Sequence, residues 1–556
     1  MTGELDPRIQ EYLDIVESGT EPMCKQQRQL ARLVKKAFET ENIHVDSDQL
    51  DRYMGQQKHF PYKLLPWEKF VFALHNCTYT ETGGLRWPIL FVLVGRGAGK
   101  NGYLAFEDFA LVTPVNGIQK YNIDIFANAE EQAKATFQDI YDILEGREKY
   151  YKRFFRWTKE EIENIATKSR IRYHTSAPKT KDGGRPGKVD FDEVHEYENK
   201  KLINVAVGGL GKRPLPRRTY ITTQGEVRDG PLDEYYNRAQ KVLAGELEDG
   251  GWLYFICQLD SDEEILDPAT WGKANPSLND PTRTELLEEI KLEFLEYKED
   301  PAGNSAFATK RMNRPQGQAE TEVTSWENIK AASREIPAEI LEQRRPAVWG
   351  VDYASTQDFV AAGVLFQAAG VYYWITHTWV CKQSKTLGRI KFPLDQAEAR
   401  GELSMIDGPE VLPDVPVQWI AEQGEKYNLL LGGIDHYRYT LLAKAFTAAG
   451  FDTDRKTGNV KLTYSPEQSQ VAPVIASLFN NHRIVWGDNM LMRWYTNNAC
   501  RIIDKRGNIS YGKIEPKTRK TDGFMALVAA MIAAGIKQEE LEAGEATAAV
   551  LPVYSF

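Results

Sequence analysis

The fold of the first half of the chain is decided by residues 88–102, which read PILFVLVGRGAGKNG. A continuous apolar run that breaks into glycines and a lysine, followed by a helical pattern, predicts a buried parallel strand leading into a phosphate-binding loop, or P-loop. Glycines let backbone N–H groups approach phosphate oxygens closely, and Lys100 would neutralise the β- and γ-phosphates. We therefore expect a nucleotide-binding α/β domain.

Two positions of this loop depart from the usual pattern. Val94 stands where the first glycine is expected, and Asn101 stands where a Ser or Thr would bind magnesium. A glycine-rich turn between strand and helix, without any ligand, is the alternative interpretation. Residues further along the chain decide between the two.

Length and composition exclude several classes of protein. A chain of 556 residues favours two or three domains, and its 42% hydrophobic and 27% charged residues are typical of a globular protein. No apolar run reaches the roughly 20 residues of a membrane span, and we expect neither a secreted nor a membrane-spanning protein. Five scattered cysteines predict neither a zinc site nor disulfides, and a net charge of −10 leaves room only for a local basic patch.

A pair of adjacent acids follows a predicted strand about 90 residues after the P-loop. Strands near 122–129 and 170–175, separated by a helical pattern, predict alternating α/β structure. In the segment 188–196, Asp192 would bind the magnesium shell and Glu193 would orient and polarise the attacking water. The alternative is a solvated acidic loop. The P-loop upstream favours ATP binding and hydrolysis.

Two further segments are candidates for the same site. Trp67 and Glu68 open a helix before the P-loop strand, where an aromatic ring with a polar neighbour can hold adenine, although a core tryptophan is the alternative. The strand 218–225 ends in Thr222, Thr223 and Gln224. At the carboxyl end of a central strand these side chains could sense hydrolysis, or simply end the strand.

The second half of the chain places isolated aspartates at predicted structural edges. Asp352 ends a strand, Asp358 follows in the turn, Asp435 ends a later strand, and Asp522 opens a helix of small and apolar residues. Their convergence would make an RNase H-type site, in which carboxylates hold two divalent metals for phosphodiester cleavage. Each aspartate alone could instead be a cap or turn residue. A basic stretch that could bind a phosphate backbone precedes Asp522 and comprises Arg501, Lys505, Arg506, Lys513, Lys517, Arg519 and Lys520.

These patterns predict an α/β fold with two main domains. The first is a P-loop NTPase domain with a central, mostly parallel sheet, and the second is an RNase H-like α/β nuclease domain. The predicted boundaries are a helical preface at 1–55, the ATPase domain at 56–312 with a lid region near 226–312, a linker at 313–340, the nuclease domain at 341–537 and a tail at 538–556.

Taken in order, the motifs resemble those of the large terminase subunit of tailed bacteriophages, an ATP-driven DNA-packaging motor with a fused nuclease. No single motif is decisive, but their order within one chain is specific, and the resemblance runs from about residue 60 to 535. It rests on Leu65-Pro66-Trp67-Glu68, Arg96-Gly97-Ala98-Gly99-Lys100, Asp192-Glu193-Val194-His195-Glu196, Thr222-Thr223-Gln224-Gly225, Ala274-Asn275-Pro276, Gly350-Val351-Asp352 and Lys520-Thr521-Asp522-Gly523.

The resemblance implies roles for individual residues. Arg96 would be the family's P-loop arginine, Glu68 would replace its adenine-reading glutamine, and Thr222 to Gln224 would be its coupling motif. The motor would work as a ring, in which one subunit supplies an arginine to its neighbour's ATP. Our candidate is Arg185, because the glycines and proline of the loop 183–187 favour a protruding loop; a solvated turn is the alternative, and Arg213, Arg217 and Arg218 compete for the role. The nucleotide site would comprise Trp67, Glu68, Arg96, Gly97, Ala98, Gly99, Lys100, Asn101 and Asp192.

The resemblance also implies cofactors and partners. We expect ATP and Mg²⁺, with Mn²⁺ as an alternative at the nuclease site. The partners would be double-stranded DNA, the portal protein of the procapsid, a small terminase subunit and further copies of this chain in a ring, expected to be a pentamer, in the host cytoplasm and with no membrane contact. The tail at 538–556 would dock on the portal, although composition alone favours disorder there.

Two other classes of protein stay open on the sequence. A helicase-like or remodelling ATPase would explain the first half but not a metal-dependent nuclease half. A non-catalytic assembly protein with degenerate sites would explain Val94 and Asn101.

Overall fold

The computed structural model describes residues 5–128, 130–174, 185–197, 199–225, 230–301, 303–314, 322–353, 359–384, 387, 390, 392–408, 410–437, 439–503, 507–514 and 519–548. The chain forms two compact units, Met1–Gln316 and Gly317–Phe556. Each unit has its own sheet. No helix among the described residues is long and apolar enough to cross a membrane.

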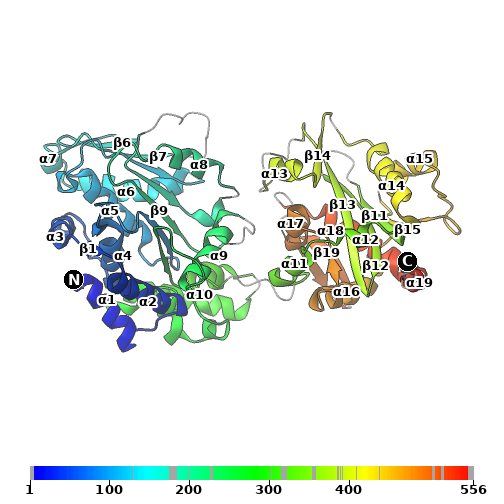
Figure 1. Cartoon of the computed structure of the whole chain (residues 1–556), viewed down its shortest axis with the longest axis horizontal. Helices are drawn as coiled ribbons and strands as arrows, with labels where there is room; N and C mark the ends of the chain where they lie inside the picture. Colours follow the sequence, from blue (N-terminus) through cyan, green and yellow to red (C-terminus); the bar gives the residue numbers. More distant parts are fainter. Residues whose placement is uncertain are drawn as a thin grey trace, which may run out of the picture. The chain divides into compact units, whose positions relative to one another are not determined.

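The first unit is built on an eight-stranded sheet (Figure 1). Six neighbouring strands run parallel, and two antiparallel strands extend one edge. In sheet order the strands are β10 (Trp252–Ile256), β3 (Ile89–Leu93), β9 (Arg217–Thr222), β8 (Lys188–Asp192), β4 (Ile123–Phe126), β7 (Arg170–His174), β6 (Glu161–Asn164) and β5 (Phe155–Trp157). The predicted central, mostly parallel sheet is confirmed.

Burial explains why the predicted P-loop strand is uniformly apolar. Residues 90–93 of β3 are fully buried, because both faces of a parallel sheet are covered. Helices of this unit are α4 (Pro66–Cys77), α5 (Lys100–Val112), α6 (Glu130–Gly146), α7 (Glu148–Tyr151), α8 (Lys201–Gly208), α9 (Pro231–Leu243) and α10 (Thr284–Glu299). A smaller core lies beyond β10 and includes Leu259, Trp271, Ile290 and Phe307.

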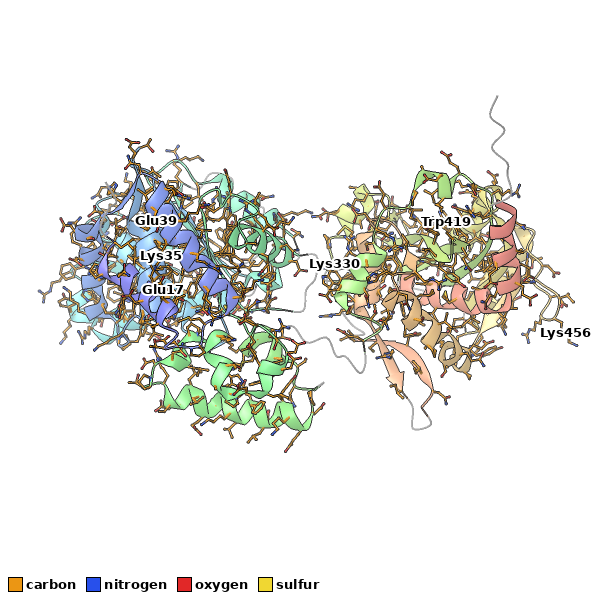
Figure 2. All side chains as sticks on the ribbon, turned by 60° about the horizontal axis from the view of Figure 1, so that its bottom comes forward. Glu17, Lys35, Glu39, Lys330, Trp419 and Lys456 are labelled. Carbon is orange, nitrogen blue, oxygen red and sulfur yellow. The ribbon has the colours of Figure 1, made fainter. Side chains whose placement is uncertain are left out.

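Residues 5–55 pack into the same core as the sheet. They form α1 (Pro7–Ser18), α2 (Lys25–Thr40), β1 (Ile43–Val45), which pairs with β2 (Thr78–Thr80), and α3 (Ser47–Met54). The ring of Tyr12 lies 4.5 Å from that of Phe70, and Glu17 of α1 pairs with Lys35 of α2 (Figure 2). This segment is part of the first unit's core.

The second unit contains a seven-stranded mixed sheet. The strands β11, β12 and β13 form an antiparallel meander, while β15 and β16 continue parallel to β11 on its other side. This arrangement is the predicted RNase H-like one. The strands are β11 (Pro346–Asp352), β12 (Phe359–Ala368), β13 (Val371–Cys381), β14 (Leu403–Ile406), β15 (Asn428–Asp435), β16 (Val460–Thr463) and β17 (Ile484–Val485).

Helix α18 (Asp522–Ile536) packs closely against this sheet (Figure 1). Paired glycines on neighbouring strands permit the approach, since a Cβ at Gly350 would lie 2.0 Å from the Ala526 carbonyl oxygen and one at Gly433 would lie 2.1 Å from that of Ala529. The remaining elements are α11 (Trp326–Ala332), α12 (Ala338–Leu341), α13 (Leu394–Ala399), α14 (Asp414–Lys426), α15 (Tyr439–Ala448), α16 (Ser465–Asn480), α17 (Met490–Asn498), α19 (Gln538–Ala548) and the hairpin of β18 (Ala499–Ile503) and β19 (Ile509–Lys513).

Part of the predicted linker at 313–340 is helical. Ile329 and Ala332 of α11 are buried in the core of the second unit. The polar stretch 315–321 lies outside the described residues.

Candidate active sites

The P-loop connects β3 to α5 through backbone that only glycine adopts easily. Gly97 and Gly99 have φ angles of 88° and 91°. The backbone N–H groups of Lys100 and Asn101, in the first turn of α5, have no hydrogen-bond partner among the described residues. Such N–H groups at a helix start are suited to binding phosphate oxygens.

Residues far away in sequence form hydrogen bonds with the backbone of the P-loop. The Gly95 N–H donates to the Ala274 carbonyl at 2.8 Å, and the Arg96 N–H donates to the Lys310 carbonyl at the same distance. The sequence analysis did not predict that residues 274–276 contact the P-loop. The loop's own carbonyls accept from side chains, with Asn275 Nδ2 at 3.1 Å and Arg311 at 2.9 Å from Arg96 O, and Ser277 Oγ at 2.8 Å from Ala98 O.

The predicted acidic pair lies beside the P-loop. Strand β9 separates β3 from β8, so the carboxyl ends of all three strands meet at one edge of the sheet. Asn101 Nδ2 donates to Asp192 Oδ2 at 3.0 Å, and Lys100 Nζ lies 3.0 Å from Glu193 Oε1. Asp190 and Asp192 are buried, which excludes the solvated acidic loop.

Glu193 adopts a left-handed backbone conformation at the turn after β8. Its φ is 49°, which is uncommon for a residue with a side chain, and its N–H donates to Asp192 Oδ1 at 2.8 Å. Burial favours protonation of Glu193, but His195 and Lys100 outweigh it and lower the pKa to about 2. Glu193 is therefore an ionised acceptor at neutral pH. Burial and the Glu193 charge raise the pKa of Asp192.

The residues predicted to couple hydrolysis to motion are buried at the end of β9. Thr222 is fully buried, and its Oγ1 accepts from the His195 N–H at 3.1 Å. The Gln224 N–H donates to Asn313 Oδ1 at 2.9 Å, close to the end of the first unit. Sequence reasoning gave His195 and Asn313 no role. In the sequence, the only indication of a role for His195 was its position two residues after Glu193.

A buried ionic cluster joins the P-loop helix to strand β8. Lys188 Nζ lies 2.8 Å from Glu107, 2.6 Å from Asp108 and 2.8 Å from Asp190, and all four side chains are fully buried. Removing one partner of such a cluster would leave an uncompensated buried charge. The cluster therefore fixes α5 relative to the Asp192–Glu193 turn.

Trp67 and Glu68 differ in how well they fit a nucleotide contact. The Trp67 indole is 2% exposed and stacks on Phe255 at 5.0 Å, so it is a core side chain with no exposed face for adenine. Glu68 Oε2 accepts from the Leu65 N–H at 2.6 Å. Its Oε1 lies 3.3 Å from the Cβ position of Gly99, and burial raises its pKa to about 8. Glu68 is therefore largely protonated at pH 7 and sits against the loop.

The candidate arginines occupy different environments. Arg96 and Arg185 are exposed, and the neighbours of Arg185 at 183–184 lie outside the described residues. Arg217 is fully buried and donates to Tyr121 at 2.7 Å, so it cannot reach another subunit. Arg213 and Arg218 are partly exposed.

In the second unit, three predicted aspartates lie at one edge of the sheet. Asp352 and Asp435 end the adjacent parallel strands β11 and β15. Asp522 is the first residue of α18, and Lys520 Nζ just before it lies 5.9 Å from the ring of Phe359. Because Phe359 begins β12 next to the end of β11, the start of α18 lies at the same edge.

The donor types fit a divalent metal, since carboxylate oxygens are the usual ligands of Mg²⁺. Among the described residues, however, no three His, Cys, Asp or Glu side chains lie close enough together to hold an ion. Asp358 lies outside the described residues. Asp522 is buried, whereas the Asp435 side chain is 45% exposed and accepts from the Tyr437 N–H at 2.9 Å.

Comparison with known families decides what these two units are. A model of the terminase large subunit ATPase domain matches residues 66–241, and a model of the terminase large subunit endonuclease domain matches 246–402. Together the two matches cover more than half of the chain. The chain belongs to the terminase large subunit family. The endonuclease match begins within the first unit of this terminase and ends before Asp435 and Asp522.

The chain is also similar to individual proteins. The terminase is 23% identical to the terminase large subunit of Lactococcus phage p2 over 80% of its own length and 81% of that protein. It is 22% identical to protein YmfN of Escherichia coli K12 over 65% of its length and 80% of that protein. The crystal structure of the HK97 bacteriophage large terminase is 18% identical and covers 88% of this chain and 100% of that one, with a TM-score of 0.46.

Membership of this family gives the terminase two activities. It is an ATPase and an endonuclease, and these two domains make a DNA-packaging motor. The domains imply the use of a nucleotide and of a divalent metal, with DNA as the packaged partner.

Proposed function

We propose that this terminase hydrolyses ATP at the Lys100–Glu193 site to drive double-stranded DNA into a procapsid, and cuts concatemeric DNA with a two-metal nuclease. The observation that supports the ATPase site most strongly is the convergence of P-loop and acidic pair, with Lys100 Nζ 3.0 Å from Glu193 and Asn101 3.0 Å from Asp192. Phosphate-binding and water-orienting groups thus lie within one hydrogen bond of each other.

Each group of the ATPase site has a distinct role. The free N–H groups of the loop and Lys100 bind and neutralise the β- and γ-phosphates, and exposed Arg96 adds positive charge from the same subunit. Asp192 and the Asn101 amide oxygen are the residues that would hold Mg²⁺, which neutralises charge on the phosphates. Glu193 orients the attacking water. Thr222, Thr223 and Gln224 transmit the change to the rest of the motor.

The nuclease site takes its ligands from the shared sheet edge. Asp352, Asp435 and Asp522 would hold the metals, with Asp358 as a further ligand, and Mg²⁺ or Mn²⁺ would activate water and stabilise the leaving oxygen. The partly exposed basic side chains Arg501, Lys513 and Arg519 would hold the DNA backbone. Lys520 of the predicted basic stretch is buried at 4% exposure and is not available to DNA. The chain's own part would be to hold Asp352, Asp435 and Asp522 together at that edge.

The motor works as an assembly in the host cytoplasm. We propose a ring of five copies, docked on the portal and loaded with DNA by a small terminase subunit. Arg185 is exposed and follows a glycine-rich stretch, so it can reach the ATP of a neighbouring subunit and stabilise the transition state.

Steady-state ATPase assays on the full chain, alone, with double-stranded DNA and with DNA plus procapsids, test this function. We expect hydrolysis that rises on adding DNA and rises again with procapsids, together with DNA protected inside them. Stimulation by DNA without any protected DNA would favour a remodelling ATPase. An absence of both hydrolysis and nucleotide-dependent thermal stabilisation would favour a non-catalytic assembly protein.

A further inference from the structure

His195 is a buried side chain that contacts two functional groups of the ATPase site without taking part in the roles assigned above. It is 6% exposed. Its Nδ1 lies 3.1 Å from Glu193 Oε2 and 3.2 Å from Thr222 Oγ1. One ring nitrogen therefore faces both the proposed water-orienting carboxylate and the first of the proposed coupling residues.

The hydrogen-bond pattern around Thr222 decides which partner is the donor. The Thr222 hydroxyl donates to the Thr223 carbonyl at 2.7 Å, so its oxygen is left as an acceptor. The backbone N–H of His195 donates to this oxygen at 3.1 Å. Nδ1 must therefore carry a proton to approach the same oxygen, and the acceptor-only Glu193 carboxylate competes for that proton.

Packing fixes the position of the imidazole. A Cβ at Gly225 would lie 2.6 Å from His195 Cδ2, so the chain following β9 closes directly over the ring. The ring cannot retreat from the turn that carries Glu193 without moving the segment that carries Thr222 and Gln224. A displacement of the Glu193 turn therefore also displaces the segment that carries Thr222 and Gln224, and the reverse holds as well.

We propose that His195 is a positioning residue that shares its Nδ1–H between Glu193 and Thr222, and so links the water-orienting carboxylate to the coupling residues. This inference rests on the proposed ATPase site. When Glu193 turns toward the attacking water, the Nδ1–H is left to Thr222. When Glu193 turns back, Thr222 loses part of that hydrogen bond. The orientation of Glu193 thereby changes the hydrogen bonding of Thr222 at the end of β9.

Side-chain amides distinguish the two ring nitrogens. An asparagine places its amide nitrogen where histidine has Nδ1, whereas a glutamine places it nearer to Nε2. We therefore compare His195→Asn, His195→Gln and His195→Leu in the full chain, measuring kcat and KM for ATP with and without double-stranded DNA. Thermal unfolding and nucleotide binding serve as folding controls.

We expect His195→Leu and His195→Gln to lower DNA-stimulated kcat by roughly tenfold or more, while KM for ATP changes by less than about twofold. His195→Asn should stay within about threefold of the parent. In a double-mutant cycle, Thr222→Val should have little further effect on kcat once His195→Leu is present, because both changes break the same link.

Parental kcat and parental stimulation by DNA in His195→Leu would overturn the proposal, as would a His195→Asn variant as inactive as His195→Leu. If His195→Leu does not fold, the Asn and Gln pair decides alone. Failure of the underlying site is recognised separately, since Lys100→Ala and Glu193→Gln would then hydrolyse ATP at the parental rate whatever the His195 variants do.

Discussion

Lys100 Nζ and Glu193 Oε1 lie 3.0 Å apart, so the cation of the P-loop is neutralised by the carboxylate proposed to orient water. The two groups come from α5 and from the turn after β8, which the buried Lys188 cluster holds together. Phosphate oxygens compete with Glu193 for Lys100, because one ammonium group cannot fully neutralise both. Binding of ATP would therefore release Glu193 as it engages Lys100.

This pairing makes opposite predictions for its two members. We expect Glu193→Gln to bind ATP at least as tightly as the parent but to hydrolyse it at least about a hundredfold more slowly, since binding no longer breaks an ion pair while the water-orienting charge is lost. Lys100→Ala should lose both binding and turnover. Equilibrium nucleotide binding and single-turnover hydrolysis measure the two effects. Near-parental turnover in Glu193→Gln would remove Glu193 from its role.

The nuclease aspartates should act independently of the ATPase site. We expect Asp352→Asn, Asp435→Asn and Asp522→Asn each to abolish plasmid cutting in Mg²⁺ or Mn²⁺ while keeping ATPase activity, because the two sites lie in units with separate cores. Asp407→Asn, at an 86% exposed side chain of the same unit, is the matched control and should cut normally. Undiminished cutting by any of the first three would exclude that residue as a ligand.

Buried Glu68 should make stability depend on pH. Burial raises its pKa from 4.5 to about 8, so the folded state binds the proton more tightly than the unfolded state. Its contribution is fully present below about pH 4.5 and is lost, by up to about 1.4 kcal/mol per pH unit, as the pH rises to about 8. Glu68→Gln keeps an oxygen for the Leu65 N–H and does not titrate.

The stability of Glu68→Gln relative to the parent should therefore increase between pH 5 and about pH 8 and then level off. Thermal unfolding of both proteins across this range measures the difference. A difference that does not change with pH would show that Glu68 is ionised in the folded protein.

Helix α18 depends on the absence of a side chain at Gly350. We expect Gly350→Ala to destabilise the second unit by roughly 3 kcal/mol or more, because its Cβ would lie 2.0 Å from the Ala526 carbonyl oxygen. Gly424→Ala, inside α14 with its nearest neighbouring atom at 3.5 Å, should instead stabilise by about 0.5 to 1 kcal/mol. Calorimetry of both variants, with ATPase activity as the readout of the first unit, tests the pair.

Arg185 can be tested by mixing subunits. Arg185→Ala protein should be inactive alone but regain some ATPase activity when mixed with Glu193→Gln protein, because mixed interfaces restore one intact site. A variant of Arg217 cannot test a contact between subunits, since Arg217 is buried within its own subunit. No recovery at any mixing ratio, in rings shown to co-assemble, would count against Arg185 acting between subunits.

Local sequence was sufficient to determine the elements whose chemistry is local. The P-loop, the acidic pair and the small-residue helix after Asp522 were each predicted, because glycine conformation, strand burial and helix starts depend on neighbouring residues. The order of these elements also predicted both domain folds. The prediction of no membrane span was also local, since hydropathy is a property of a short window.

Tertiary structure alone decided which distant groups meet. The insertion of β9 between β3 and β8 brings Thr222 to His195 and Glu193, and no pattern within any one segment encodes that strand order. Trp67 could have faced a ligand or the core, and only its stacking on Phe255 shows the latter. The carbonyls of Ala274 and Lys310 hold the P-loop through backbone atoms that every residue possesses, so side-chain identity carries no signal of the contact.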